Sequence, residues 1–257
     1  MTAVPDLLDA DLERRFGGLR RLYGEAGYRR VRSARIVVVG LGGVGSWAAE
    51  ALARSGVAQL VLIDMDHVSE SNINRQVQAV GATLGQSKGE ALRLRIADIH
   101  PACDVVLIDD FVTADNWPAL WPHESDVLID ACDQVHAKVA MAAWALAHHA
   151  PLVTVGAAGG KRRPQAVEVE DLAETSHDPL LASMRQRLRK MHGAARTGRI
   201  GVRCVFSRES VMLPEVCESG DAVDGNLNCH GYGSTVTVTA TFGLVAAQDA
   251  LQCVLSK

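Results

Sequence analysis

The chain contains six cysteines but no pair of them in the C-x-x-C spacing. Cysteines paired in that way are typical of zinc ribbons and thiol redox sites, so we expect neither zinc nor a redox motif. Isolated thiols are instead typical of proteins kept in a reducing cytoplasm. Residues 1–15 contain acids and no apolar run, so they predict no secretory signal, and we expect a cytoplasmic protein.

The composition also lacks the biases of disordered and fibrous chains, since 48% of the 257 residues are hydrophobic and 22% are charged. Residues 231–248 contain no charged residue and are rich in Thr, Gly and Ala. Their length would allow a membrane span, but Asp249 follows at once, and a buried segment near the C-terminus is the favoured interpretation. We therefore expect no association with a membrane.

Acidic residues are missing from residues 179–208, which contain eight of the 26 basic residues, whereas all 30 acidic residues lie elsewhere. The formal net charge of −4 therefore conceals a positive segment in an acidic chain. Most charge runs are solvated helix faces, but such faces normally mix both signs. A protein that binds a polyanion needs its positive charge in one place, so this segment predicts a polyanion-binding surface. The residues concerned are Arg185, Arg187, Arg189, Lys190, Arg196, Arg199, Arg203 and Arg208.

The first two-thirds of the chain alternates short apolar runs with Ala/Leu-rich helical patterns. Strands are predicted at 35–39, 60–63, 105–108, 127–129 and 152–155, and helices at 44–54, 87–99 and 135–149. Strands that alternate with helices form parallel β-α-β units. The sequence therefore predicts an α/β fold with a doubly wound, mostly parallel, Rossmann-like sheet.

The rhythm changes after about residue 160. Strands are predicted near 165–173 and 202–207, and a helix at 178–191. Residues 234–242 alternate as a strand does, whereas 244–254 have a helical pattern, and periodicity leaves this segment open. We expect residues 161–257 to form a smaller α+β extension of the same domain, and residues 1–160 to bind a nucleotide.

The glycines Gly40, Gly42, Gly43 and Gly45 follow the first predicted strand and open a helix. This context makes a G-x-G-x-x-G match specific, because glycines let a phosphate approach the backbone at a helix N-terminus. Asp64 ends the second strand, where a carboxylate binds a ribose hydroxyl. The pattern therefore predicts a nucleotide site.

Polar and cationic residues follow Asp64, including Asn72, Arg75 and Gln76, and Lys88 begins the next helix. An Arg and a Lys beside a glycine loop suit a triphosphate better than the diphosphate of a nicotinamide cofactor, which backbone groups already hold. An oxidoreductase is therefore the weaker alternative. Each cation alone would more often be a solvated surface charge.

Two acids, Asp130 and Asp133, end the fourth strand at the edge where open sheets bind ligands. A carboxylate there can hold Mg²⁺ against phosphates. One of the two acids could instead cap the following helix.

The segments GLGGVGSWAAEALARSG, LIDMDHVSESNINRQ and DACDQ, together with Lys88, resemble the ubiquitin-activating-enzyme-like (ThiF/MoeB/HesA-type) adenylating superfamily. Further segments resemble its branch of tRNA threonylcarbamoyladenosine dehydratases: RFGGLRRLYG (15–24), DDFVT (109–113), GAAGG (156–160), DPL (178–180), CVFS (204–207) and TVTATFG (237–243). The resemblance thus extends over nearly the whole chain. Zinc-containing relatives have two C-x-x-C pairs, which this chain lacks.

This resemblance implies an ATP-dependent homodimer that converts threonylcarbamoyladenosine beside the tRNA anticodon to its cyclic form, by adenylating the threonine carboxylate. It implies that Asp64 binds the ribose, that Asn72, Arg75 and Lys88 bind the phosphates, and that Asp133 binds Mg²⁺. The polyanion would then be tRNA, docked on residues 185–203.

The resemblance also implies that an arginine of RFGGLRRLYG reaches into the partner's site; Arg21 is favoured over Arg20. Cys229 matches a cysteine of the branch, but ring closure within one side chain needs no enzyme nucleophile, so a structural thiol is favoured. The main alternative is an adenylyltransferase that activates the C-terminus of a ubiquitin-like sulfur carrier. A nucleotide-binding scaffold, a bound monovalent cation and sulfur-transfer partners such as a cysteine desulfurase are left open.

Overall fold

The computed structural model describes residues 10–122, 124–212 and 232–257. One seven-stranded sheet has the strand order β3-β2-β1-β4-β5-β7-β6. The strands are β1 (Arg35–Val39), β2 (Gln59–Ile63), β3 (Asp104–Ile108), β4 (Val127–Asp130), β5 (Leu152–Val155), β6 (Val167–Asp171) and β7 (Arg203–Ser207). All neighbouring strands are parallel except β6, which runs antiparallel to β7. The predicted fold class is confirmed.

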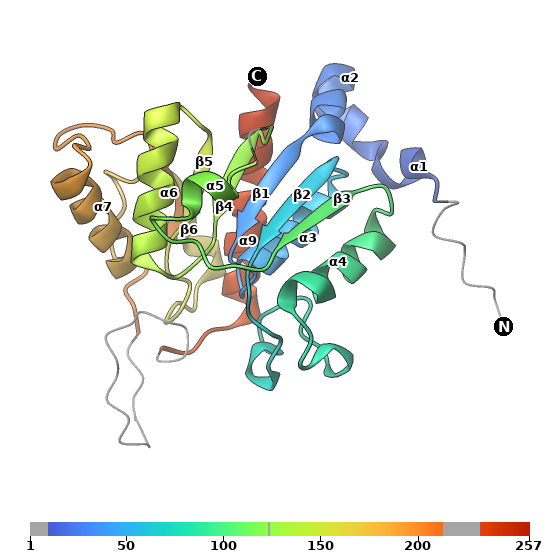
Figure 1. Cartoon of the computed structure of the whole chain (residues 1–257), viewed down its shortest axis with the longest axis horizontal. Coiled ribbons are helices and arrows are strands. Elements are labelled where there is room, and N and C mark those ends of the chain that lie inside the picture. Colours follow the sequence, from blue (N-terminus) through green and yellow to red (C-terminus); the bar gives the residue numbers. More distant parts are fainter. Residues whose placement is uncertain (1–9, 123, 213–231) are drawn as a thin grey trace.

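Helices cover both faces of this sheet (Figure 1). One face packs against α2 (Gly18–Ser33), α3 (Gly45–Arg54), α4 (Lys88–Ile99) and α9 (Val236–Leu255). The other packs against α5 (Trp117–Leu120), α6 (Val135–His148) and α7 (Pro179–Met191). The short helix α1 (Leu12–Phe16) precedes α2. The strand residues alternate between the two cores, as the apolar runs predict for strands buried on both faces.

The C-terminal extension completes the same sheet, because β7 pairs with β5 and β6 pairs with β7. Residue 160 is therefore not a boundary between two sheets. The division of the chain there into a nucleotide-binding part and a C-terminal extension stays a prediction. The parallel strands β1, β4, β5 and β7 all end at one edge, which we call the carboxyl edge. Ligands of open parallel sheets bind at this edge.

The open segment near the C-terminus is the helix α9, so the strand-like alternation of residues 234–242 is misleading. Its buried residues recur every fourth position, at Val238, Phe242, Ala246, Ala250 and Val254, which is the period of a helix. Threonine hydroxyls bond back within the helix, as from Thr241 Oγ1 to the Thr237 carbonyl at 2.7 Å. The helix is long and apolar enough to cross a membrane, but most of it is buried in this core.

Because α9 packs closely on α3, adding one methyl group at their contact should destabilise the fold. A Cβ at Gly243 would overlap the Val44 carbonyl oxygen and lie 2.8 Å from Trp47 Cβ. We expect Gly243→Ala to lower the free energy of unfolding in urea by about 1–3 kcal/mol, although alanine favours helices. Gly81→Ala is the control, since a Cβ there meets no described atom within 4 Å, and it should change stability little. Equal stability of the two variants would contradict the close packing.

Candidate nucleotide site

The glycine loop between β1 and α3 is pressed against the segment that follows β4. Gly40 has a φ of 84°, and a Cβ there would lie 2.9 Å from the backbone nitrogen of Cys132. A Cβ at Gly45 would overlap the Gly40 carbonyl oxygen. At Gly42, in contrast, a Cβ would meet no described atom within 4 Å. Glycine is thus required by packing at two positions, while Gly42 leaves room for a phosphate.

Arg75 lies against this loop and is almost fully buried. Its Cγ atom lies 3.2 Å from where a Cβ of Gly43 would be, so the glycine makes room for the arginine. The Arg75 guanidinium donates to the Ser71 carbonyl at 2.7 Å and to Asn74 Oδ1 at 2.9 Å, and the Trp47 indole donates to the Arg75 carbonyl. The structure therefore brings two predicted elements together, the glycine loop and Arg75.

Asn72 and Gln76 are also buried, but their side chains support the chain around Arg75. Asn72 Oδ1 accepts a hydrogen bond from the Ser69 amide at 3.0 Å and closes a short 3-10 turn. Gln78, which the sequence analysis did not single out, donates to Gln76 and to the Leu41 carbonyl of the glycine loop. In the sequence, the only signal for Gln78 is that it is a glutamine with apolar neighbours.

Asp64 and Lys88 meet beside the glycine loop. Asp64 Oδ2 accepts from the Leu41 amide at 2.6 Å, and its Oδ1 accepts from the Asp66 amide at 2.8 Å. Burial raises the pKa of the Asp64 carboxyl, and the charge of Lys88 partly opposes this shift. Lys88 itself is paired with Asp66 at 2.7 Å, a partner that the sequence analysis missed. This arrangement holds a carboxylate and an ammonium at the carboxyl edge.

The two acids after β4 have different surroundings. Asp130 is fully buried and paired with Lys138 at 3.0 Å, whereas Asp133 is exposed. Helix α6 begins after Gln134, so the alternative that one of the acids caps it is wrong. Only Asp133 is therefore available to a ligand at this point.

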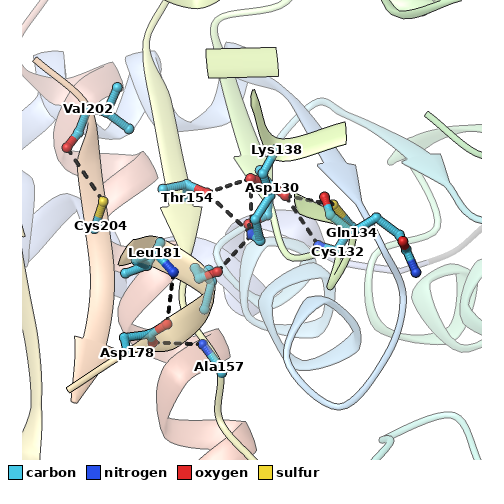
Figure 2. A network of polar contacts seen from close by, with 11 residues as sticks. Asp130, Cys132, Gln134, Lys138, Thr154, Ala157, Asp178, Leu181, Val202 and Cys204 are labelled. Atoms are coloured by element: carbon cyan, nitrogen blue, oxygen red, sulfur yellow. Dashed lines mark hydrogen bonds and ion pairs between the residues drawn. The ribbon is translucent and has the colours of Figure 1, made fainter. Parts of the chain in front are cut away.

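Figure 2 shows the polar network around Lys138, in which side chains of β4, β5 and α6 point toward one another. The Lys138 ammonium also donates to the Val155 carbonyl at 2.7 Å and to Thr154 Oγ1 at 3.3 Å. Burial alone would lower the pKa of Lys138, but the charge of Asp130 raises it above its ordinary value. The Lys138 ammonium therefore joins the adjacent strands β4 and β5 below the site.

The surroundings of Cys132 disfavour its thiolate form. Burial and the charge of Asp130 raise the pKa of its thiol well above the ordinary range. Its Sγ atom donates to Asp130 Oδ1 at 3.0 Å, which fixes the bend after β4. The other cysteine of interest, Cys229, lies outside the described residues.

Two neighbouring arginines of α2, Arg20 and Arg21, differ in their pairing, as Asp130 and Asp133 do. Arg20 is paired with Glu13 at 3.0 Å and with Glu25 at 2.6 Å, and its guanidinium lies over the Tyr28 ring. Arg21 is exposed and makes no ion pair with any residue that the structure describes. This favours Arg21 as the arginine that reaches out of the subunit, which stays a prediction.

The positive segment separates into two groups. Arg185 donates to carbonyls of the chain before α7, Arg203 is paired with Asp249, and Arg208 is paired with Glu168, so these three arginines already have partners within the fold. Arg199 lies 3.8 Å from Asp171 and is otherwise exposed, and Arg187 lies beside the His136 ring. A surface groove of about 430 Å³, which we call the basic groove, is lined by Ala182, Arg185, Gln186, Arg189, Lys190 and Arg196.

The carboxyl edge therefore combines an open glycine loop, the cations Arg75 and Lys88, and the carboxylates Asp64 and Asp133. Cations that flank a glycine loop and a helix N-terminus suit the phosphates of a nucleoside triphosphate. A carboxylate at the end of the second strand suits its ribose.

Comparison with known proteins gives consistent matches. Residues 15–257 match the ThiF family. The chain is 44% identical over 252 residues, covering 95% of it and 94% of the relative, to a tRNA threonylcarbamoyladenosine dehydratase of Escherichia coli. A crystal structure of an E. coli tRNA N6-threonylcarbamoyladenosine dehydratase in complex with ATP has a TM-score of 0.87 and 43% identity, covering 96% of each chain. A molybdopterin-synthase adenylyltransferase of Salmonella typhimurium is 38% identical, over 50% of this chain and 51% of its own length.

The buried network predicts a large effect of removing Lys138. We expect Lys138→Met to lower the free energy of unfolding by about 3–5 kcal/mol, because it leaves the Asp130 carboxylate buried without its partner. Lys190→Met, at an exposed lysine, is the matched control and should change stability by about 0.5 kcal/mol or less. The double variant Asp130→Asn with Lys138→Met should be more stable than Lys138→Met. Urea denaturation measures all of these, and equal losses in Lys138→Met and Lys190→Met would contradict the role of the pair.

Proposed function

The chain belongs to the ThiF family, and from this premise we propose that it is an ATP-dependent tRNA threonylcarbamoyladenosine dehydratase. The observation that supports this most strongly is the 44% identity over almost the full length of both chains. The geometry agrees, because the glycine loop, Arg75 and Lys88 lie together at the carboxyl edge. Nicotinamide oxidoreductases and non-catalytic scaffolds are therefore dropped as alternatives.

The reaction follows from the chemistry of a carboxylate, whose oxygen is a poor leaving group. In the first step, an oxygen of the threonine carboxylate attacks the α-phosphorus of ATP, and pyrophosphate leaves. In the second step, an atom of the adjacent carbamoyl group attacks the carbonyl carbon of the acyl adenylate, and AMP leaves with the carboxylate oxygen. The net result is loss of water at the expense of ATP. Intramolecular attack is favoured by its high effective concentration.

We assign the nucleotide contacts from the observed positions. Gly42 lies where the backbone is open to a phosphate, and Asp64 lies where its remaining lone pairs can accept from a ribose hydroxyl. Arg75 and Lys88 would offset the repulsion between the anionic carboxylate and the phosphates. Asn72 and Gln76 would act by holding the turn that carries Arg75.

Magnesium at Asp133 is part of the proposal. Asp133 is exposed at the carboxyl edge, whereas Asp130 is already neutralised by Lys138, so one carboxylate is free. Mg²⁺ is commonly bound by one or two carboxylates together with substrate phosphates, which fits this arrangement. When bound, the ion would neutralise phosphate charge and orient the pyrophosphate group.

A homodimer is also proposed, with two exposed leucines of α2 and α9 as its candidate contacts. Leu22 on α2 is 68% exposed and Leu244 on α9 is 49% exposed, and these two helices pack together. Exposed apolar residues gathered on neighbouring helices are typical of interaction sites. Arg21 lies next to Leu22, so a partner that covers this surface would receive the arginine.

tRNA binding is proposed at the basic groove, where Arg189, Lys190 and Arg196 are gathered on one surface. Lysines and arginines in this arrangement contact phosphates and make affinity strongly dependent on salt. Arg187 and Arg199 belong to the same positive segment of the chain as these cations. Arg185 and Arg203 would support the groove through their bonds within the fold.

The location in the cytoplasm, a monovalent cation and sulfur-transfer partner proteins stay predictions from the sequence. The alternative substrate, a ubiquitin-like sulfur carrier, is weakened because the molybdopterin-synthase adenylyltransferase resembles only half of the chain. ATP–pyrophosphate exchange tests the proposal directly. We expect exchange to depend on tRNA that contains threonylcarbamoyladenosine, and exchange that depends instead on a carrier protein would favour the alternative.

Replacing Asp133 should affect the rate more than nucleotide binding. We expect Asp133→Ala to lower turnover by roughly 100-fold or more and ATP affinity by less than about tenfold, since correct metal placement matters most in the transition state. Asp115→Ala, at another exposed aspartate, is the control and should behave as wild type. Equal losses of rate and binding would show that Asp133 only supports the nucleotide or the fold.

Removing the basic groove's cations should weaken tRNA binding. The triple variant of Arg189, Lys190 and Arg196 to Ala should lower affinity and reduce the salt slope by roughly one unit per lost phosphate contact, with ATP affinity unchanged. The matched control replaces Arg14, Arg93 and Lys257, which are exposed and change the net charge equally. Wild-type affinity and slope in the groove variant would place the tRNA elsewhere.

Cys229 should be dispensable. We expect Cys229→Ser to keep at least several per cent of ATP-dependent activity, because the carbamoyl group is itself the nucleophile in ring closure. Complete loss of activity in a variant that still binds ATP and tRNA would instead require a covalent step on this thiol. Cyclic product measured by mass spectrometry of nucleosides is the readout.

A further inference from the structure

A second depression adjoins the basic groove at the N-terminal end of α7. It has a volume of about 370 Å³, mostly apolar walls, and shares Ala182 and Arg185 with the groove. The rest of its lining includes His177, Pro179, Ser210 and Val211. The two depressions are therefore neighbours along α7, one lined by cations and the other mostly apolar. We call the mostly apolar depression the α7 pocket.

The α7 pocket lies at the carboxyl edge of the sheet. Asp178, the N-cap of α7, accepts hydrogen bonds from the amides of Ala157 at 2.8 Å and Leu181 at 3.0 Å, and Ala157 follows the end of β5 (Figure 2). Ser210 follows the end of β7. Because β4, β5 and β7 are successive neighbours, about 4.8 Å apart, the end of β7 lies roughly 10 Å from the end of β4.

His177 is presented outward by a backbone that is held from behind. Its φ of 56° is uncommon for a residue other than glycine. Its carbonyl accepts a hydrogen bond from the buried Lys161 ammonium at 2.9 Å, and the next residue is the buried Asp178. The imidazole ring, in contrast, is on an exposed residue whose Nδ1 lies 3.1 Å from Ser176 Oγ. A flat ring thus lies at the rim of an apolar depression.

This combination is the one that a single-stranded RNA loop requires. Such loops present unstacked bases, which bind apolar pockets and stack on histidine or arginine, while their phosphates contact nearby cations. We propose that the α7 pocket binds the purine base of the substrate nucleoside and that the basic groove binds the phosphates next to it. His177 is then a positioning residue for the substrate, since it contacts the base and not the reacting carboxylate.

The distances fit the substrate of the proposed function, on which this inference rests. The threonylcarbamoyl group is about as long as two extended residues of a peptide chain, so it reaches roughly 6–7 Å from the purine. By these estimates a base in the α7 pocket brings the carboxylate to within roughly 3–4 Å of the end of β4, where Asp133 and the glycine loop lie.

The test compares two anticodon stem-loops, one complete and one abasic at the substrate nucleoside, by fluorescence anisotropy. We expect wild type to bind the complete stem-loop roughly tenfold more tightly. Ala182→Trp, which fills the α7 pocket, should bind both equally, whereas Ala147→Trp, at an exposed alanine of α6, should keep the wild-type ratio. His177→Ala should lower the ratio and raise the KM for tRNA with little change in kcat, and His177→Phe should restore both.

An unchanged ratio in Ala182→Trp and His177→Ala, with ATP affinity and folding intact, would overturn the assignment. A wild-type ratio of one would also overturn it, since only phosphates would then be recognised. The proposed function has its own readout, which is formation of the cyclic nucleoside by wild type. If wild type forms this product while the ratio is one, the inference fails alone, and if it forms none, the proposed function fails.

Discussion

The site depends on the close contact between the glycine loop and the segment that follows β4. Gly40 has no room for a side chain because the backbone of Cys132 lies against it, and Cys132 is in turn held by Asp130. Asp130 is paired with Lys138, which is buried beside it. The loop that faces the nucleotide is therefore supported by an ion pair that is closed to solvent, and its geometry is set before any ligand binds.

Several charged side chains around this sheet are held in ion pairs. Lys88 is paired with Asp66 beside Asp64, and Arg20 is paired with two glutamates, so these cations are held in place by neighbouring acids. On α7 the exposed cations gather in the basic groove, away from the glycine loop. This separation agrees with the proposal that one acidic chain binds two anionic substrates, since Arg75 and Lys88 lie at the carboxyl edge and the cations of the basic groove lie along and after α7.

Much of this arrangement could be predicted from the sequence. Alternating strands and helices gave the parallel sheet, and the glycine spacing located the nucleotide loop, because both are patterns of neighbouring residues. The helical pattern of residues 244–254 is visible in the sequence, but periodicity leaves the first part of α9 open, since its alternating threonines imitate a strand and packing against α3 selects the helix. Asp130 and Lys138 are eight residues apart in β4 and α6, and Asp66 and Lys88 are 22 residues apart, so no local pattern could separate the buried acid from the exposed Asp133.

The central claim is that the threonine carboxylate is adenylated, which breaks the bond between the α- and β-phosphates. Mass spectrometry of nucleosides from treated tRNA, with ATP replaced by methylene analogues, tests it most directly. The account predicts cyclic product with ATP and with the β,γ-methylene analogue, and none with the α,β-methylene analogue. Product formed with the α,β-methylene analogue but not with the β,γ-methylene analogue would show transfer of the terminal phosphate and would contradict adenylation.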